Sequence, residues 1–157
     1  MSNTTRATLT LAAEGVAYNL HPYDYAPGSD RVGLQAAKAL GLDPALVLKT
    51  LMAKADRKAI CVVVPSNREV KMKALAALLG VKSVEMMKPA EAERVTGFRV
   101  GGISPFGQRQ PATTVFEEDA LAFECVYINA GQRGLLLSIS PADAVRIVQA
   151  RTGAISA

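Results

Sequence analysis

The most constraining feature of this sequence is a continuous apolar run at residues 59–64, Ala-Ile-Cys-Val-Val-Val, which Pro65 ends. The run is rich in β-branched residues and shows no alternation with polar residues. Such a pattern is typical of a β-strand that is buried on both faces. We therefore expect this strand to lie inside a sheet with helices around it.

Helical and strand-like patterns alternate along the rest of the chain, and turn residues separate them. The last three predicted strands follow one another without a helix, which indicates a mixed sheet and not a purely parallel one. We predict a single α/β domain over residues 1–157, with a mixed sheet surrounded by helices. Helices are predicted at residues 4–14, 32–40, 71–79, 88–95 and 140–151, strands at residues 16–23, 47–53, 59–64, 81–86, 112–116, 124–128 and 135–139, and a loop at residues 26–30.

The net charge of +4 and the isoelectric point of about 9.2 are compatible with an anionic partner such as RNA. The basic residues are scattered, however, and net charge without a clustered patch does not identify a nucleic-acid surface. The N-terminus lacks a signal-peptide pattern, and no apolar stretch approaches the roughly 18 residues of a membrane span. We therefore expect a cytoplasmic protein that makes no membrane contact.

The two cysteines, Cys61 and Cys125, both lie in apolar, strand-like runs, so we expect two buried, reduced thiols. The sequence has one histidine, His21, and a structural zinc site needs four nitrogen or sulfur ligands at close spacings. We expect no metal and no cofactor. A half-exposed His21 with a satisfied ring is favoured over a catalytic one, because it lies beside a proline and no nucleophile motif accompanies it.

Lys49 is a charged residue inside an apolar strand pattern, Leu48-Lys49-Thr50-Leu51. Strand alternation alone would place its side chain in solvent. Alternatively, a lysine at the floor of a pocket can hold a phosphate or polarise a carbonyl group. The pattern by itself leaves both interpretations open.

Two later segments have the composition of ordered loops that could bind a ligand. Residues 101–107, Gly-Gly-Ile-Ser-Pro-Phe-Gly, can expose backbone N–H groups that bind an oxygen anion, although most Gly-Gly pairs are only turns. Residues 129–134 are predicted to form the turn of a hairpin. In a functional interpretation, Asn129 and the glycine backbone of this turn would face the same cleft as the first loop.

Taken in order, these segments resemble the YbaK/EbsC family of trans-editing proteins, whose fold is also that of the editing domain of prolyl-tRNA synthetase. The resemblance covers nearly the whole chain, and its most specific parts are the Lys-Thr-Leu strand and the Gly-Gly-Ile-Ser-Pro loop. The matching segments are residues 21–24, 48–51, 84–86, 96–97, 100–107 and 127–134.

The resemblance implies a mixed α/β fold with a barrel-like sheet and an enzyme that hydrolyses the ester between a misattached amino acid and the terminal adenosine of tRNA. Members most similar to this pattern clear Cys from tRNA(Pro), and other branches clear Ala. The implied partners are a mischarged tRNA and, as a candidate, prolyl-tRNA synthetase. The essential residue of the family is the strand lysine, which matches Lys49. We expect the backbone N–H groups of Gly101 and Gly102 to act with it as a second catalytic donor. The implied substrate-binding residues are Tyr23, Val32, Thr50, Ile103, Ser104, Pro105, Asn129 and Gly131.

Two positions depart from the family pattern. Asn129 stands where close relatives have a small hydroxyl residue, and Val32 stands where an aromatic residue is common. Either change would reshape the pocket, so the preferred amino acid stays open between Cys, Ala and other small residues. A non-catalytic module that binds aminoacyl-tRNA or a synthetase is the competing interpretation, and Lys49 together with the intact glycine loop favours the enzyme.

Overall fold

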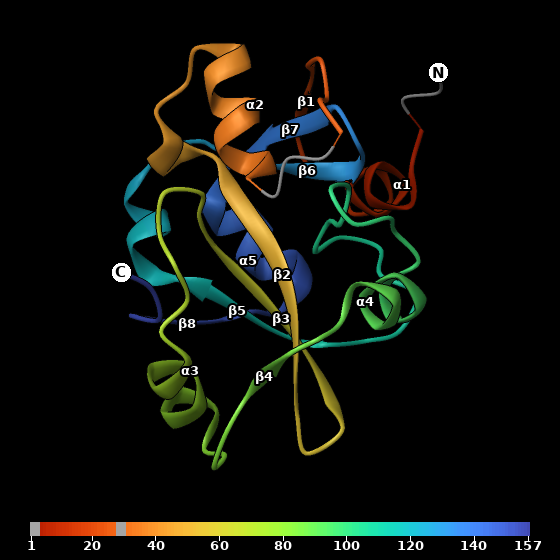
Figure 1. Ribbon diagram of the computed structural model, residues 1–157. Coiled ribbons are helices and arrows are strands. Elements are labelled where there is room, and N and C mark those ends of the chain that lie inside the picture. Colours follow the sequence, from red (N-terminus) through yellow and green to blue (C-terminus); the bar gives the residue numbers. More distant parts are fainter. Residues whose placement is uncertain (1–3, 28–30) are drawn as a thin grey trace.

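The computed structural model describes residues 4–27 and 31–157, and it contains two β-sheets flanked by helices (Figure 1). Residues 28–30 of the predicted loop lie outside the described part. The larger sheet has the strand order β4 (Glu85–Met86), β2 (Leu48–Ala55), β3 (Lys58–Pro65), β5 (Thr113–Glu117) and β8 (Arg151–Gly153). The smaller sheet has the order β1 (Asn19–Pro22), β7 (Leu135–Ile139) and β6 (Val126–Gln132).

The larger sheet is mixed, as predicted, because β3 pairs with β2 antiparallel and with β5 parallel. The strand β5 also pairs in parallel with β8, whereas the smaller sheet is antiparallel throughout. The sequence-based expectation of one barrel-like sheet is not confirmed. The two sheets are not closed, and an isolated bridge between Val47 and Tyr127 connects them.

The central strand β3 is buried on both faces, which confirms the prediction from its apolar run. Cys61 and Val63 belong to the main core, whereas Ile60, Val62 and Val64 belong to a second core on the other face. In Figure 1 α5 lies behind β2 and β3, and Ala144 of this helix belongs to the main core. The helix α3 covers the second core through Leu75 and Ala76.

The helices begin and end close to the residues that the turn signals predict. They are α1 (Arg6–Ala13), α2 (Val32–Leu40), α3 (Met72–Leu79), α4 (Pro89–Thr96) and α5 (Pro141–Val148), with 3-10 turns η1 (Pro44–Leu46) and η2 (Glu118–Ala122). Thr5 forms a capping box at the start of α1, and Asp43 caps η1. The helix α2 ends at Gly41, which takes the left-handed conformation with φ of 67° that favours glycine.

Several predicted boundaries are wrong. The last helix ends at Val148, because Gln149 is left-handed with φ of 52°. Arg151, the last residue expected in this helix, is instead the first residue of β8. Of the strand predicted at residues 81–86 only Glu85–Met86 pairs, and the first strand is shortened to Asn19–Pro22. Within the described residues, no helix has the length and apolar character needed to cross a membrane.

The turn predicted at residues 129–134 is shorter than expected. The strand β6 continues through Asn129 to Gln132 with an irregular register against β7, so only the last two residues of that segment connect the strands. At its other end β6 begins at Val126 and not at residue 124. Cys125 therefore precedes the strand and is exposed, which corrects the expectation of two buried thiols, whereas Cys61 is buried.

Candidate functional site

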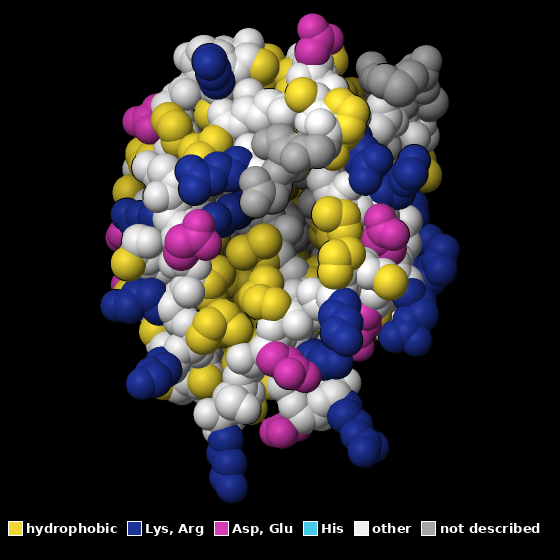
Figure 2. Space-filling view, in the orientation of Figure 1, with side chains coloured by type: hydrophobic (Ala, Val, Ile, Leu, Met, Phe, Trp, Pro, Cys, Tyr) yellow, Lys and Arg dark blue, Asp and Glu magenta, His cyan; other side chains and the backbone are white. Residues whose placement is uncertain are grey.

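A cavity of about 790 Å³ opens where the start of β2 meets the smaller sheet. Its walls come from β2, the start of α2, the segment that connects β3 to α3, the residues around β4 and the loop before β5. Figure 2 shows this face of the molecule, with hydrophobic side chains gathered at a central hollow and charged side chains around them. Of the sequence-predicted site residues, the lining includes Tyr23, Val32, Lys49, Thr50, Gly101, Ile103 and Asn129.

Lys49 lies on β2, opposite Val64 of β3, and lines the cavity. Its side chain is only 22% exposed, and its Nζ lies 3.4 Å from Oε1 of Glu69. Lys49 is therefore not the fully solvated lysine that strand alternation alone suggests. Its ammonium group lies beside the Glu69 carboxylate at the cavity. It is a cation to which an anionic or polarised oxygen of a ligand could bind.

Tyr23 and Thr50 are lining residues of the cavity, and their hydroxyl oxygens are buried and make no hydrogen bond within residues 4–27 and 31–157. Burial raises the pKa of Tyr23 and outweighs the opposite effect of the Gly134 backbone, so the phenol stays protonated. A buried polar group without a partner costs about 1–3 kcal/mol of stability. Such groups are rare in cores, and a ligand that accepts their hydrogen bonds removes the cost.

The loop at residues 99–103 brings Gly101 to the cavity. The Gly101 carbonyl oxygen accepts a hydrogen bond from Nδ2 of Asn129 at 3.1 Å, and φ of Gly101 is +92°. A Cβ at this position would lie 2.9 Å from Tyr25 Oη, so the close approach requires glycine. The Gly101 N–H makes no hydrogen bond within the described part of the chain and stays available.

The second glycine differs from the first. Gly102 is buried, and its N–H donates to the Arg99 carbonyl oxygen at 2.8 Å. This N–H closes a turn and is not free to bind a substrate oxygen in this structure. Of the two glycines that the sequence suggests as backbone donors, Gly101 lines the cavity, and its N–H has no partner within residues 4–27 and 31–157.

Three further sequence-predicted residues lie outside the lining. Ser104 is fully buried, and its Oγ accepts a hydrogen bond from the Phe106 N–H at 3.2 Å, so it shapes the loop. Pro105 is buried beside it. Gly131 donates its N–H to Asn129 Oδ1 at 2.7 Å, and it therefore helps to orient the side chain that bonds to the Gly101 loop.

His21 is half-buried, and its Nε2 lies 2.8 Å from Ser138 Oγ, which confirms the expectation of a satisfied ring.

Sequence reasoning missed Glu69 and an apolar wall of four methionines. Methionine side chains are flexible and polarisable, so this wall can adapt to the shape of a bound group. Among the described residues of the lining, Arg31 and Lys49 are basic and Glu69 is acidic. The wall consists of Met52, Met72, Met86 and Met87.

Comparison with known proteins decides the family. The family model described as the aminoacyl-tRNA editing domain matches residues 31–147, about three quarters of the chain. The chain belongs to this family. The matched part of the editing domain contains Lys49, Thr50, Gly101 and Asn129, whereas Tyr23 precedes it.

Individual relatives of this editing domain agree with the resemblance seen in the sequence. An Enterococcus faecalis protein, EbsC, provisionally named a Cys-tRNA(Pro)/Cys-tRNA(Cys) deacylase, is 31% identical over 121 residues, which are 76% of this chain and 74% of EbsC. The proline–tRNA ligase of Desulforamulus reducens is 28% identical over 109 residues, which are 68% of this chain and 19% of the ligase. This chain therefore spans about a fifth of that ligase.

The fold also agrees with a solved structure. The crystal structure of a protein described provisionally as a trans-editing enzyme for prolyl-tRNA synthetase superposes with a TM-score of 0.86, at 22% identity, over 100% of this chain and 98% of the other. At this identity the likeness establishes the fold of the editing domain alone. Within the described residues, no three His, Cys, Asp or Glu side chains are grouped as metal ligands would be.

Proposed function

We propose that this protein is a trans-editing deacylase that hydrolyses the ester of mischarged aminoacyl-tRNA, with Lys49 as its central residue. The observation that carries the proposal is the position of Lys49, whose largely covered ammonium group lies on the wall of the cavity. Tyr23 and Thr50 also line the cavity, and within the described residues their buried hydroxyls make no hydrogen bond. Membership of the editing-domain family supports the substrate class.

Ester hydrolysis requires stabilisation of the negative charge that develops on the carbonyl oxygen. In our proposal the Lys49 ammonium is the main donor to that oxygen and the unpaired Gly101 N–H is the second. A positioned donor of this kind is worth roughly 2.7–4 kcal/mol of transition-state stabilisation. The hydroxyls of Tyr23 and Thr50 would orient the terminal ribose and the amino acid, which would satisfy two buried groups that lack partners.

The size of the cavity supports a substrate larger than a small amino acid alone. Its volume of about 790 Å³ lies within the range of roughly 300–1,000 Å³ that is typical of small-molecule sites. An aminoacyl group together with the terminal adenosine is a ligand of this class. The tRNA body would then remain outside and contact the protein through its phosphates, which predicts binding that weakens as salt rises.

For the amino acid we propose cysteine carried by tRNA(Pro), because the relative EbsC is named for this activity. With a cysteinyl ester the substrate's own thiolate can attack the carbonyl carbon. The new C–S bond closes a thiolactone ring, the ester C–O bond breaks, and the terminal ribose oxygen leaves with the proton that the thiol gave up. Water then opens the thiolactone to free cysteine, so no protein nucleophile is required. Asn129 and Val32 both line the cavity, and their identities would set the preference between Cys and Ala.

We further propose that the protein acts as a single domain in the cytoplasm, alone or beside prolyl-tRNA synthetase. The test of the central proposal is amino-acid release from Cys-tRNA(Pro), Ala-tRNA(Pro) and Pro-tRNA(Pro). We expect rapid loss of cysteine that Lys49→Ala lowers by about 100-fold or more. Lys54→Ala is the matched control, because Lys54 lies on the same strand and also pairs with carboxylates, but does not line the cavity.

Two outcomes would contradict the proposal. A normal rate in Lys49→Ala would remove Lys49 from its central role. If the folded wild-type protein released no amino acid from any of the three charged tRNAs, but bound them, the non-catalytic module would be the better description.

A further inference from the structure

Glu69 is the one acidic residue among those described as lining the cavity, and it lies directly beside Lys49. Its Oε1 is 3.4 Å from Lys49 Nζ, and its side chain is 89% exposed, whereas that of Lys49 is 22% exposed. The carboxylate therefore lies on the open side of the cavity and the ammonium group on the covered side. A ligand that enters the cavity meets both groups.

The backbone of Glu69 is fixed by a segment far away in the sequence. The N–H of Glu69 donates to the Ala157 carbonyl oxygen at 3.0 Å, and the Ala157 N–H donates back to Glu69 at 3.0 Å. Two residues further on, the Lys71 N–H donates to the Ile155 carbonyl oxygen at 2.7 Å. The exposed carboxylate is thus carried by a main chain that is paired on one side like a strand.

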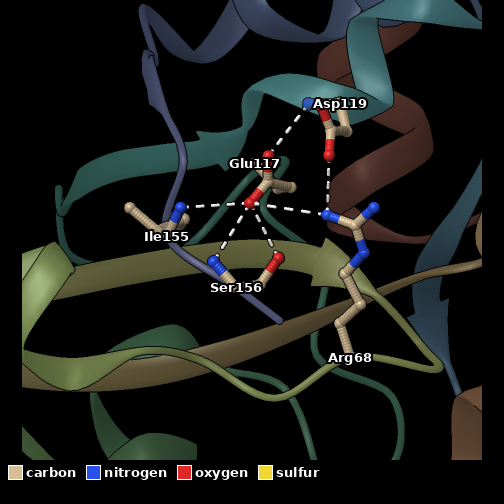
Figure 3. A network of polar contacts seen from close by, with 5 residues as sticks. All are labelled: Arg68, Glu117, Asp119, Ile155 and Ser156. Carbon is tan, nitrogen blue, oxygen red and sulfur yellow. Dashed lines mark hydrogen bonds and ion pairs between the residues drawn. The ribbon is translucent and has the colours of Figure 1, made fainter.

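A buried carboxylate, Glu117, anchors that pairing segment (Figure 3). Its Oε1 accepts hydrogen bonds from the N–H groups of Ile155 and Ser156 at 3.0 Å each and from the Ser156 hydroxyl at 2.7 Å. Arg68, the neighbour of Glu69, places its Nη1 3.8 Å from the same oxygen and 2.8 Å from Asp119 Oδ2. The Glu117 carboxylate therefore contacts both paired segments, the one that contains Ile155 and Ser156 and the one that contains Arg68.

We propose that Glu69 is the subsite for the free α-ammonium group of the amino acid, an inference that rests on the deacylase function proposed above. An aminoacyl ester carries its carbonyl oxygen and its ammonium group on adjacent carbon atoms. If Lys49 binds the carbonyl oxygen, a carboxylate 3.4 Å from Nζ is placed to receive the neighbouring ammonium group. Opposite charges at this separation attract, and the carboxylate accepts the N–H bonds.

This subsite would separate two chemical classes of tRNA ester. Free aminoacyl esters keep the cation that Glu69 binds. N-acylated esters, such as those of a peptide or an N-acetyl amino acid, have lost that charge and present an amide instead. Because Glu69 is largely exposed, its ion pair is worth up to about 1 kcal/mol, which corresponds to a preference of about fivefold.

The experiment compares Cys-tRNA(Pro) and N-acetyl-Cys-tRNA(Pro) with the wild-type protein, Glu69→Gln and Glu85→Gln. Glu85→Gln is the matched control, because Glu85 is an exposed carboxylate 3.6 Å from the β2 lysine Lys54 and does not line the cavity. We expect Glu69→Gln to lower kcat/KM for the free ester about threefold to fivefold, mainly through KM. Its rate with the N-acetyl ester, and both rates of Glu85→Gln, should stay at wild-type values.

An equal loss on both esters would overturn the proposal and show that Glu69 acts only by positioning Lys49. Unchanged rates on both esters would also overturn it.

If the wild-type protein hydrolysed neither ester, the proposed function would fail. A binding measurement would then test whether Glu69 is the subsite for the ammonium group. The probes are then 3′-alanylamido-3′-deoxyadenosine and its N-acetyl derivative, measured by calorimetry. A preference for the free amine that Glu69→Gln abolishes supports the subsite, and equal affinities overturn it.

Discussion

The side chain of Asn129 joins the glycine loop to strand β6: its Nδ2 donates to the Gly101 carbonyl oxygen at 3.1 Å. The other end of the same amide, Oδ1, accepts the N–H groups of Gly131 at 2.7 Å and Gln132 at 3.2 Å. One side chain therefore fixes both the irregular end of β6 and the position of Gly101 on the cavity wall. It can do so only because the amide offers a donor and an acceptor at once.

The first prediction separates these two tasks of Asn129. Asn129→Asp keeps an acceptor for the two N–H groups of β6 but removes the donor to Gly101, so the loop should loosen while the strand stays intact. We expect amino-acid release to fall about tenfold, with the free energy of unfolding reduced by only about 1 kcal/mol, the net worth of one hydrogen bond. Asn129→Ala should lower stability further, and urea unfolding beside release kinetics measures both. Equal stabilities of the two variants would contradict the assignment of separate roles to the amide donor and the amide acceptor of Asn129.

The second prediction concerns the close approach of Gly101 to Tyr25. Gly101→Ala should lower activity, because its Cβ would lie 2.9 Å from Tyr25 Oη and would push the loop out of place. Gly41→Ala is the control: it also has a positive φ, +67°, but no atom lies within 4 Å of its Cβ position. The control should lose about 1 kcal/mol of stability to backbone strain and keep full activity. Full activity in Gly101→Ala would show that the loop is not part of the site.

The third prediction follows from the two different thiols. Burial raises the pKa of Cys61 to about 12, whereas Cys125 is exposed. In the native protein a thiol reagent should modify Cys125 alone, and Cys61 should react only after unfolding. Peptide mapping of the labelled protein distinguishes the two. Labelling of native Cys61 at the rate of Cys125 would contradict the burial.

The raised pKa of Cys61 also predicts a pH dependence of stability. Above about pH 8.5 the unfolded chain releases this proton while the folded protein keeps it, so the free energy of unfolding falls as pH rises. The contribution of this group should approach about 1.4 kcal/mol per pH unit and continue until the folded pKa is reached. Because other groups titrate in the same range, the measurement is the difference between wild type and Cys61→Ala. The extra slope should disappear in the variant.

The fourth prediction tests the buried carboxylate of Glu117. Glu117→Gln should reduce the free energy of unfolding by about 3 kcal/mol. The charged hydrogen bonds that Ile155 and Ser156 donate to this buried carboxylate would weaken, and the ion pair with Arg68 would be lost. Glu118→Gln, at the exposed neighbouring position, should change stability by less than about 0.5 kcal/mol. Urea unfolding gives both values. Hydrogen exchange should show faster opening of residues 69–71 only in Glu117→Gln.

Local signals explain what the sequence predicted well. The apolar run of β3 and the glycine that follows α2 act within one element, so they identified a doubly buried strand and a helix that spans Val32–Leu40. The turn before β7 was predicted too long because Asn129 and Gly131 favour turns, whereas pairing with β7 continues past Asn129. Tertiary pairing overrode the local preference there.

The site was predictable in part for the same reason. Lys49 was noticed because a charge in an apolar strand is unusual. Glu69 gave no such signal, because its place beside Lys49 depends on pairing with Ala157 and on the register of β2 with β3. Gly102 and Ser104 have the residue types of a binding loop, yet their polar groups serve a turn and a local bond to Phe106. Sequence alone does not separate these uses.

The pairing of Glu69 with Ala157 has a consequence for synthesis. A ribosome releases Lys49, Gly101 and Asn129 well before Ala157, so the nascent chain holds the other parts of the cavity wall before the strand partner of Glu69 exists. The rim on that side is completed last, after residues 155–157 emerge and dock against Glu117. A nascent chain without residues 155–157 would therefore lack the fixed carboxylate, and the proposed selection between classes of substrate would begin only after these residues have docked.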